Sequence, residues 1–335
     1  MQESELRQDP MTKDWVVIAP ARAKRSHSPD VPPRAQAAPS DPSCPFCAGN
    51  ETLTPPEVYR DADREGGWLV RVVPNKFAAL SPGASETRKE GFFRSAPGVG
   101  RHEVIIETPS HSGDISGMSP EHVARILRAY RERQRKVSED PSVRFVVIFR
   151  NHGERAGTSL LHPHSQLVAT PVVPALVRRK HEMAERYFDD TGRCVYCDVR
   201  DAEIADGARL IECTAAFAVF APFASRSPYE MWITPHEMRA SFALATDDEI
   251  DDLARILRKS LRRLRACCGD VDYNYVIYSC PRKDEDEDYF LWHLQIVPRI
   301  SHSAGFEIGS GMFINTVAPE LAAQELRAAQ FDQVE

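Results

Sequence analysis

The sequence predicts an α+β protein built from two similar domains, and three observations support this fold class. The chain has 335 residues, a length that suits two average domains. Its apolar content of 42% is enough to build a buried core in each domain. The third observation is a repeat: each half contains, in order, Cys-x-x-Cys, Pro-(x)-His, a helix, a strand and His-x-Gln. We therefore place the domains at residues 1–178 and 179–335.

The first half contains four segments rich in β-branched or aromatic residues, which predict strands. They lie at residues 15–19, 68–73, 100–108 and 144–149. Residues 26–43 are rich in proline, alanine and serine without a helical or strand period, and this predicts a long loop. A helix is predicted to begin at Pro120, because Ser119 is a good N-cap and apolar residues follow at helical spacing.

The second half repeats this order of elements. Strands are predicted at residues 217–220, 230–234, 273–278 and 292–297. Apolar residues at helical spacing predict one helix over residues 247–266 and another over 321–329. The repeated order indicates an internal duplication, in which the copies share a scaffold but not necessarily their chemistry.

Residues 157–168 are the stretch that points most directly to a functional site. His162, His164 and Gln166 occupy alternate positions in an apolar segment that is predicted to be a strand. Because side chains of a strand alternate between its two faces, all three are expected to share one face. A lone histidine there would indicate a satisfied core residue, but three aligned polar side chains indicate a site.

The eight cysteines predict metal binding better than a disulfide framework, because no signal peptide precedes them. Two Cys-x-x-Cys pairs follow polar, turn-rich segments, whereas a redox pair is expected after a strand of a βαβ unit. Tetrahedral zinc needs four nitrogen or sulfur ligands. The first expected set is Cys44, Cys47, His111 and one histidine of the central stretch. The second expected set is Cys194, Cys197, His236 and His293.

Charge and hydropathy exclude several classes of partner. The net charge of −7 argues against a nucleic acid partner, and neither cysteine pair has a basic recognition helix beside it. No apolar run reaches the roughly 18 residues that a membrane-spanning helix needs. With no signal peptide at the N-terminus, we expect a soluble cytoplasmic protein.

The first zinc set leaves one histidine of the central stretch free for chemistry. A neutral imidazole attacks phosphorus near pH 7 and leaves again readily, so it can carry a nucleotidyl group between two substrates. Asn151, Gly157 and Ser159 could donate hydrogen bonds to the α-phosphate. Arg22 and Arg25 could bind a terminal phosphate.

These residues carry a resemblance to the galactose-1-phosphate uridylyltransferase family, a branch of the histidine-triad superfamily. The matching segments are Asn151 to Gln166, Trp15 to Arg25 and Arg71 to Leu80. The resemblance implies two fused histidine-triad-like domains, each an antiparallel sheet with helices packed on it. It also implies a homodimer and a role in galactose or other carbohydrate metabolism.

The resemblance also implies a role for each residue of the central stretch. His164 would be the nucleophile that becomes uridylylated or adenylylated, and His162 would complete the first zinc site. Gln166, where hydrolytic relatives have a third histidine, would bind the phosphoryl oxygens. Asn75 and Phe77 would lie in the substrate site.

The expected function is therefore a ping-pong nucleotidyltransferase, with UDP- or ADP-glucose as donor and a sugar 1-phosphate or phosphate as acceptor. The chain departs from the usual uridylyltransferase pattern at Lys76, Gly311 and Val317, near the nucleoside and the hexose. The Gly305–Gly309 run and the second cysteine pair instead resemble the ADP-glucose phosphorylase type of relative, which uses inorganic phosphate. A non-catalytic, zinc-stabilised nucleotide-binding protein is the alternative from a different class.

Overall fold

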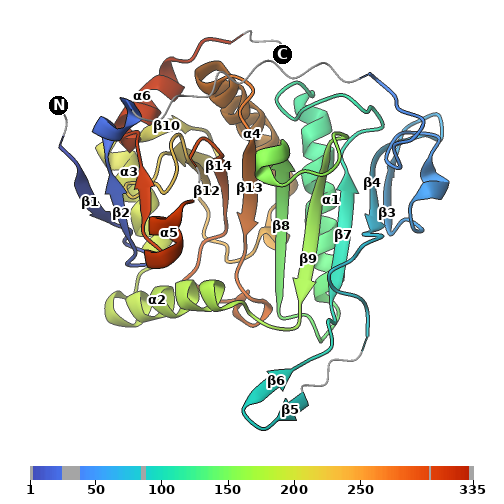
Figure 1. Cartoon of the computed structure of the whole chain (residues 1–335), viewed down its shortest axis with the longest axis horizontal. Coiled ribbons are helices and arrows are strands. Elements are labelled where there is room, and N and C mark those ends of the chain that lie inside the picture. Colours follow the sequence, from blue (N-terminus) through green and yellow to red (C-terminus); the bar gives the residue numbers. More distant parts are fainter. Residues whose placement is uncertain (1–2, 25–37, 84–87, 302, 332–335) are drawn as a thin grey trace.

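A ten-stranded antiparallel sheet forms the centre of the computed structural model, which describes residues 3–24, 38–83, 88–301 and 303–331 (Figure 1). The first half of the chain contributes β3 (Tyr59–Ala62), β4 (Trp68–Pro74), β7 (Arg101–Ile106), β8 (Phe145–His152) and β9 (His164–Thr170). The second half contributes β10 (Leu210–Cys213), β11 (Phe217–Phe220), β12 (Met231–Pro235), β13 (Tyr273–Tyr278) and β14 (His293–Pro298).

The order of the strands repeats within the sheet. The first half runs β3-β4-β7-β9-β8 and the second runs β10-β11-β12-β14-β13, so corresponding strands occupy corresponding places. The two halves meet where β8 pairs antiparallel with β13, with Tyr273 opposite His152 and Ile277 opposite Ile148. The predicted α+β class and the antiparallel sheets are confirmed. Residue 178 lies within a helix (Ala175–Thr191), and the division of the chain into domains there stays a prediction.

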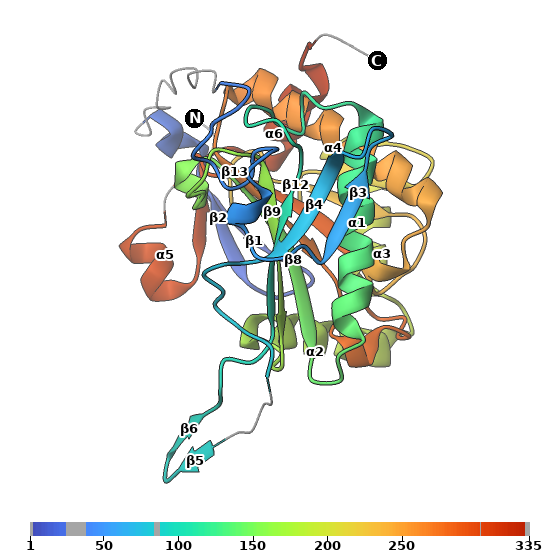
Figure 2. The same ribbon diagram turned by 90° about the vertical axis from the view of Figure 1, so that its right-hand side faces the viewer.

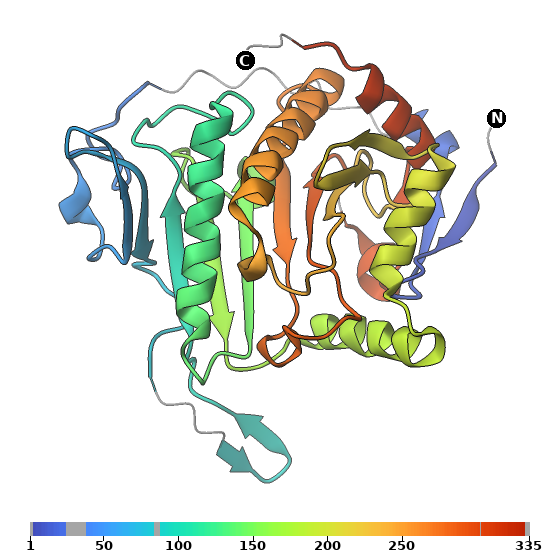
Figure 3. The same cartoon turned by 180° about the vertical axis from the view of Figure 1, so that it is seen from behind.

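Helices cover one face of this sheet (Figure 3). They are chiefly α1 (Pro120–Ser138) and α4 (Asp247–Cys268), which pack against each other at the junction of the halves. The side chain of Ser119 caps the first turn of α1 as predicted, and Thr246 forms a capping box with Glu249 at the start of α4. The largest hydrophobic cluster lies between these helices and the sheet.

Four further helices surround the sheet: α2 (Ala175–Thr191), α3 (Val195–Asp206), α5 (Gly305–Ser310) and α6 (Pro319–Ala328). Only α6 was predicted as a helix. A three-stranded sheet contains β1 (Glu5–Gln8), β2 (Trp15–Ile18) and β15 (Phe313–Asn315). The hairpin β5 (Arg88–Glu90) and β6 (Phe93–Ser95) projects from the body (Figure 2). No helix in the described part of the chain is long and apolar enough to cross a membrane.

The central stretch is shorter as a strand than the sequence predicted. Strand β9 begins at His164, so His162 lies in the segment that enters the strand. Pro163 has no amide hydrogen for the ladder, and its carbonyl accepts a hydrogen bond from the Glu107 amide instead. The prediction that all three polar side chains share one strand is therefore wrong for His162.

Candidate active site and metal centre

Four side chains of the first half form a group that could hold a metal ion: Cys44, Cys47, His111 and His162. All four are buried, and their ligand atoms lie within 4.8 Å of one another. Among the described residues no other group of three or more histidine, cysteine or acidic side chains is placed in this way. The predicted first set is therefore brought together.

The distances within this group fit tetrahedral zinc. The Nδ1 atom of His162 lies 3.7 Å from Cys44 Sγ and 3.6 Å from Cys47 Sγ, and His111 Nδ1 lies 3.4 Å from Cys47 Sγ. With zinc bonds of about 2.3 Å to sulfur and about 2.1 Å to nitrogen, neighbouring ligand atoms are about 3.6 Å apart. His162 Nε2 donates to the Thr108 carbonyl at 2.8 Å, which directs the Nδ1 lone pair at the thiols.

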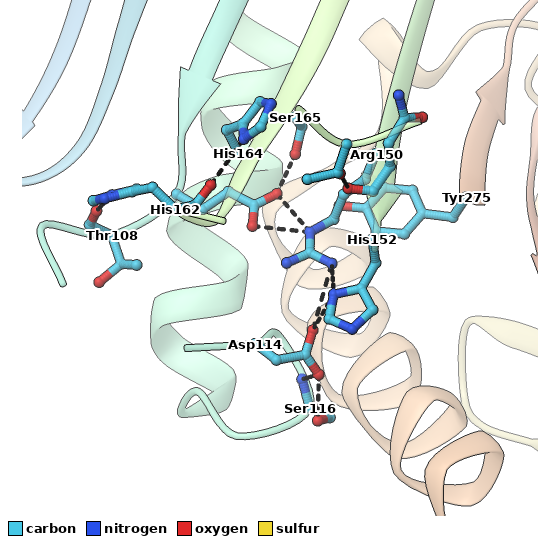
Figure 4. A network of polar contacts seen from close by, with 12 residues as sticks. Thr108, Asp114, Ser116, Arg150, His152, His162, His164, Ser165 and Tyr275 are labelled. Carbon is cyan, nitrogen blue, oxygen red and sulfur yellow. Dashed lines mark hydrogen bonds and ion pairs between the residues drawn. The ribbon is translucent and has the colours of Figure 1, made fainter. Parts of the chain in front are cut away.

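The ring of His164 is oriented by the same segment of backbone. Its Nδ1 donates to the carbonyl of His162 at 2.8 Å, so the proton is on Nδ1 and the lone pair is on Nε2 (Figure 4). Burial lowers the pKa of His164, which keeps the imidazole neutral near pH 7. The geometry thus presents a neutral ring whose Nε2 is available as a nucleophile.

Gln166 follows two residues later and is held by a histidine that the sequence did not single out. Its Oε1 accepts from His102 Nε2 at 2.7 Å, and His102 Nδ1 accepts from the Ala79 amide at 3.1 Å. Because the oxygen of the Gln166 amide is occupied, its NH2 group is the one left to donate to a ligand. His102 was a lone histidine in a predicted strand, and only the pairing of Glu103 and Val104 with Leu167 and Gln166 brings it to the site.

The loop between β8 and β9 supplies the other predicted phosphate contacts. Gly157 has a φ of +93°, a conformation that favours glycine, and an added Cβ would lie 3.6 Å from the side-chain nitrogen of Asn151. Asn151 uses its side-chain oxygen to accept from Asn274 at 2.8 Å, so its NH2 group faces Gly157. Ser159 is exposed, and its hydroxyl has no hydrogen-bond partner among the described residues.

The remaining predicted substrate contacts are less closely tied to the site. Asn75 follows β4, and its backbone amide donates to the His102 carbonyl at 2.8 Å. Its side-chain amide also lies 3.1 Å from His102 Nε2, the atom that contacts Gln166. The ring of Phe77 is 86% exposed. Arg22 is exposed in the 3-10 turn Pro20–Lys24 and makes no hydrogen bond or ion pair with the described histidines, and Arg25 lies outside the described residues.

A buried polar network supports β9 from the helix side (Figure 4). Glu107 is fully buried, and both of its carboxylate oxygens accept from Arg150 Nε, at 3.1 and 3.0 Å. Ser165, which lies between the two site residues of β9, also donates to Glu107. Strand β9 is therefore attached on one face to the segment that carries His162 and on the other to a buried ion pair.

The network continues to the second half of the chain. Tyr130 and Tyr275 share a hydrogen bond of 2.6 Å between their hydroxyl groups, and Arg150 Nη1 donates to Tyr273 at 2.8 Å. Asp114 accepts from Tyr273 at 3.0 Å and lies 3.4 Å from Arg150. Burial raises the pKa of Asp114, but Arg150 and His152 lower it more, so the carboxyl stays ionised. The sequence offered no signal for this network, because its members are scattered along the chain.

The second predicted zinc set is not brought together. Cys194 is the N-cap of α3 and Cys197 lies in its first turn, not in a loop, and the Cys197 Sγ is 3.5 Å from the sulfur of Met238. His236 Nε2 instead donates to the Thr214 carbonyl at 3.3 Å. His293 is stacked on Trp232, with ring centroids 4.4 Å apart. A second metal site therefore has no support from the geometry of these four residues.

Family models match both halves of the chain. Residues 1–174 match the model described as galactose-1-phosphate uridyl transferase, N-terminal domain. Residues 106–332 match a model described as a domain of unknown function.

Individual relatives match nearly the whole chain. The ADP-glucose phosphorylase of Arabidopsis thaliana is 38% identical and covers 97% of this chain and 93% of its own length. The galactose-1-phosphate uridylyltransferase of Thermotoga maritima is 27% identical, with 98% of this chain and 99% of the relative covered. A crystal structure of an ADP-glucose phosphorylase from Arabidopsis thaliana with bound ADP-glucose has a TM-score of 0.84 at 35% identity, covering 99% and 100% of the two chains. A uridylyltransferase structure has a TM-score of 0.75 at 28% identity, covering 97% and 98%.

Proposed function

The chain belongs to the galactose-1-phosphate uridylyltransferase family, and we propose that it transfers a nucleoside monophosphate through a covalent intermediate on His164. Its relatives are uridylyltransferases and an ADP-glucose phosphorylase, so it is an enzyme of the nucleotidyltransferase type. The observation that carries the proposal is the hydrogen bond from His164 Nδ1 to the His162 carbonyl, because it leaves the Nε2 lone pair free.

In the first step, His164 Nε2 attacks the α-phosphorus of a nucleotide sugar. The bond from this phosphorus to the bridging oxygen breaks, and sugar 1-phosphate leaves with the electron pair. In the second step, an oxygen of the acceptor phosphate attacks the same phosphorus, and the P–N bond breaks to restore the neutral ring. The two steps share one site, so ping-pong kinetics are expected.

Three groups are placed to stabilise the charge that develops on the α-phosphate. Gln166 would donate from its NH2 group, because His102 occupies the amide oxygen. Asn151 and Ser159 would donate from the opposite side of the nucleophile, from the end of β8 and the loop after it. A glutamine cannot act as a general acid or base, and this favours transfer over hydrolysis.

We assign zinc to the group of Cys44, Cys47, His111 and His162 on the basis of its donor set and spacing. Zinc there would fix the segment that enters β9, and with it the carbonyl that orients His164. No catalytic step needs the metal. The proposal does not include a zinc ion at the second cysteine pair.

For the substrates we propose ADP-glucose as nucleotidyl donor and inorganic phosphate as acceptor, which would give ADP and glucose 1-phosphate. The support is the 38% identity to the Arabidopsis thaliana ADP-glucose phosphorylase, against 27% to the Thermotoga maritima uridylyltransferase. The second candidate, UDP-glucose with a hexose 1-phosphate acceptor, is favoured by the match of residues 1–174 to the uridyl transferase model. A cytoplasmic location and a homodimer stay predictions of the sequence.

Intact-mass measurement can test both the intermediate and the base. The zinc-loaded protein is incubated separately with ADP-glucose and UDP-glucose, and any added group is mapped. An AMP adduct on His164 supports the phosphorylase, and a UMP adduct supports the uridylyltransferase. The isolated adduct is then divided between inorganic phosphate and galactose 1-phosphate, and the acceptor that removes the group identifies the second substrate. If neither nucleotide sugar modifies His164, the covalent mechanism is wrong for these substrates.

A further inference from the structure

A cavity of about 510 Å³ lies in the second half of the molecule, away from His164. Trp232, Tyr278 and Gln295 line it from three adjacent strands of the main sheet. Helices α2 and α3, the turn after β1 and strand β15 supply the other walls. None of the residues assigned to the catalytic site lines this cavity.

The cavity lies where the duplication repeats the catalytic site. Gln295 is two residues after the start of β14, as Gln166 is two residues after the start of β9. The amide of Gln295 is also held from the neighbouring strand, since its nitrogen donates to Glu230 at 2.6 Å. In the first half the corresponding contact joins Gln166 to His102 at 2.7 Å. The second half has therefore kept the framework of a ligand site with different polar groups.

Glu230 does not add a free negative charge to the cavity. Its Oε1 accepts from Trp232 Nε1 at 3.0 Å and from Gln295, and its Oε2 accepts from the amides of Arg226 at 2.8 Å and Ser227 at 3.2 Å. Four donors satisfy the carboxylate within the protein. The nitrogen of the Gln295 amide is directed at Glu230, and the amide oxygen is the atom left for a ligand or water.

Lys180 of α2 is a buried cation with three carboxylates in its neighbourhood, those of Asp9, Asp14 and Glu230. It is only 7% exposed and lines the cavity, yet its ammonium group makes no hydrogen bond or ion pair with any described residue. Its Nζ lies over the ring of Tyr278, 4.1 Å from the ring centroid. Burial and the nearby charge of Arg226 lower the pKa of Lys180 to about 8, although the three carboxylates favour its charged form.

The other cations of the cavity differ in their pairing. Arg209 is paired with Glu203 and Glu320, each at 2.8 Å. Arg226 is paired with Asp14 at 2.9 Å. Arg299, directly after β14, lines the cavity and has no ion pair among the described residues. Lys180 and Arg299 are therefore left without an ion pair among the described residues. The Asp9 carboxylate also lines the cavity, and its Oδ1 accepts from the amides of Met11 at 2.8 Å and Thr12 at 3.3 Å. The apolar part of the lining includes Leu176, Phe223, Val297 and Phe313.

We propose that this cavity binds a small phosphate monoester with a ring, of nucleoside or sugar type, with its phosphate beside Lys180. The volume of about 510 Å³ suits such a ligand, and the apolar walls would contact the ring. The site binds but does not react. His293, the counterpart of the nucleophile, is fully buried among aromatic rings and does not line the cavity.

Equilibrium dialysis with two probes, AMP and glucose 1-phosphate, tests the proposal. The wild-type protein should bind one more probe molecule per chain than Lys180→Met, because the variant lacks the charge that would bind the phosphate. Methionine is chosen because its side chain is similar in length to that of lysine. We expect the affinity of this site to fall about tenfold or more in the variant. Lys283→Met is the matched control, because Lys283 is 77% exposed and does not line the cavity. The two probes distinguish a nucleoside from a sugar body.

Equal numbers of bound probe in the wild type and Lys180→Met would overturn the proposal. A second variant, Ala202→Trp, fills the cavity from an exposed position of α3 and should abolish the same binding event, which keeps the test decisive if Lys180→Met does not fold. Zinc content and the His164 adduct are measured on the same samples. If the wild-type protein binds two probe molecules per chain but forms no adduct on His164, the proposed reaction is refuted and the proposed cavity site is not.

Discussion

His164 and His293 occupy corresponding positions in the two halves of the main sheet, but their surroundings differ. Each is the first residue of its strand, and each donates from Nδ1 to the carbonyl two residues earlier, at 2.8 and 3.0 Å. The residue that supplies this carbonyl differs: it is the metal-site residue His162 in one half and the buried Leu291 in the other.

The neighbouring strands increase this difference. Asn151 is next to Arg150, which pairs with Ser165, so its amide lies beside His164. In the second half Tyr278 pairs with His293 and stacks on it, at 5.1 Å between centroids. The Nε2 atom of His293 is consequently buried without a hydrogen-bond partner. Thus the backbone sets the tautomer in both halves, whereas the neighbouring side chains decide whether the lone pair can reach a substrate.

Substituting the two histidines separately should give the largest difference in activity between the halves. His164→Gly should lower nucleotidyl transfer by about 10⁴-fold or more and abolish the covalent adduct, because the nucleophile is gone. His293→Phe is the matched variant in the second half, and its transfer rate should stay within about twofold. Steady-state rates and intact mass measure both. A normal adduct in His164→Gly would contradict the assigned roles.

Loss of a cysteine should affect zinc content and stability in the first half only. Cys44→Ser should release zinc and lower the free energy of unfolding by about 5 kcal/mol or more, because metal binding is coupled to folding. Cys194→Ser should leave the zinc content unchanged at one ion per chain. Metal analysis of purified protein and urea unfolding measure these effects. Two zinc ions per wild-type chain, with one lost in Cys194→Ser, would show that the second cysteine pair binds metal after all.

Among the described residues of the second half, the buried ion pair beneath β9 has no counterpart: the apolar pair Ile277 of β13 and Leu294 of β14 belongs there to the hydrophobic cluster under the helices. Glu107→Gln leaves the buried Arg150 without its main counter-ion, and we expect a loss of about 3–5 kcal/mol of stability. Ile277→Val is the apolar control and should cost about 0.5–1.5 kcal/mol. Denaturant unfolding compares them. A cost for Glu107→Gln no larger than that of the control would mean that Asp114 alone compensates Arg150.

The two glutamines test whether the donor to the phosphate belongs to one half. Gln166→Ala should reduce kcat by about 10²–10³-fold, the effect of losing one donor to a developing oxyanion. Gln295→Ala should leave kcat unchanged, since Gln295 lines the other cavity. Single-turnover rates of adduct formation give the answer. Slower adduct formation in Gln295→Ala would contradict this expectation and show that the second half affects catalysis in the first.

The smallest effect is expected at His102, which we expect to act through its hydrogen bond to Gln166. His102→Ala should lower kcat by about tenfold, with little change in KM, because a mispositioned amide weakens only the transition state. His102→Ala in the Gln166→Ala background should add little further loss, since both act through one contact. A full additional tenfold loss in the double variant would assign His102 a separate role.

The sequence by itself determined which elements the protein repeats and which side chains can do chemistry. Spacing of apolar residues predicted α1, α4 and the central strands, since these are long or strongly patterned. The cysteine pair with His111 and His162 was predictable as a ligand set, because few residue types bind zinc. The resemblance of the central stretch separated His162 from His164 in role, and the geometry agrees for the metal ligand.

Only the tertiary structure decided where each polar group found its partner. His102, Glu107 and Arg150 gave no sequence signal, because a hydrogen bond between strands depends on register and not on spacing along the chain. The second cysteine pair looked the same as the first in sequence, yet the structure surrounds it with Met238 and Leu291 in place of further ligands. A local motif specifies which atoms can bind a metal, but the fold must bring the remaining ligands to it.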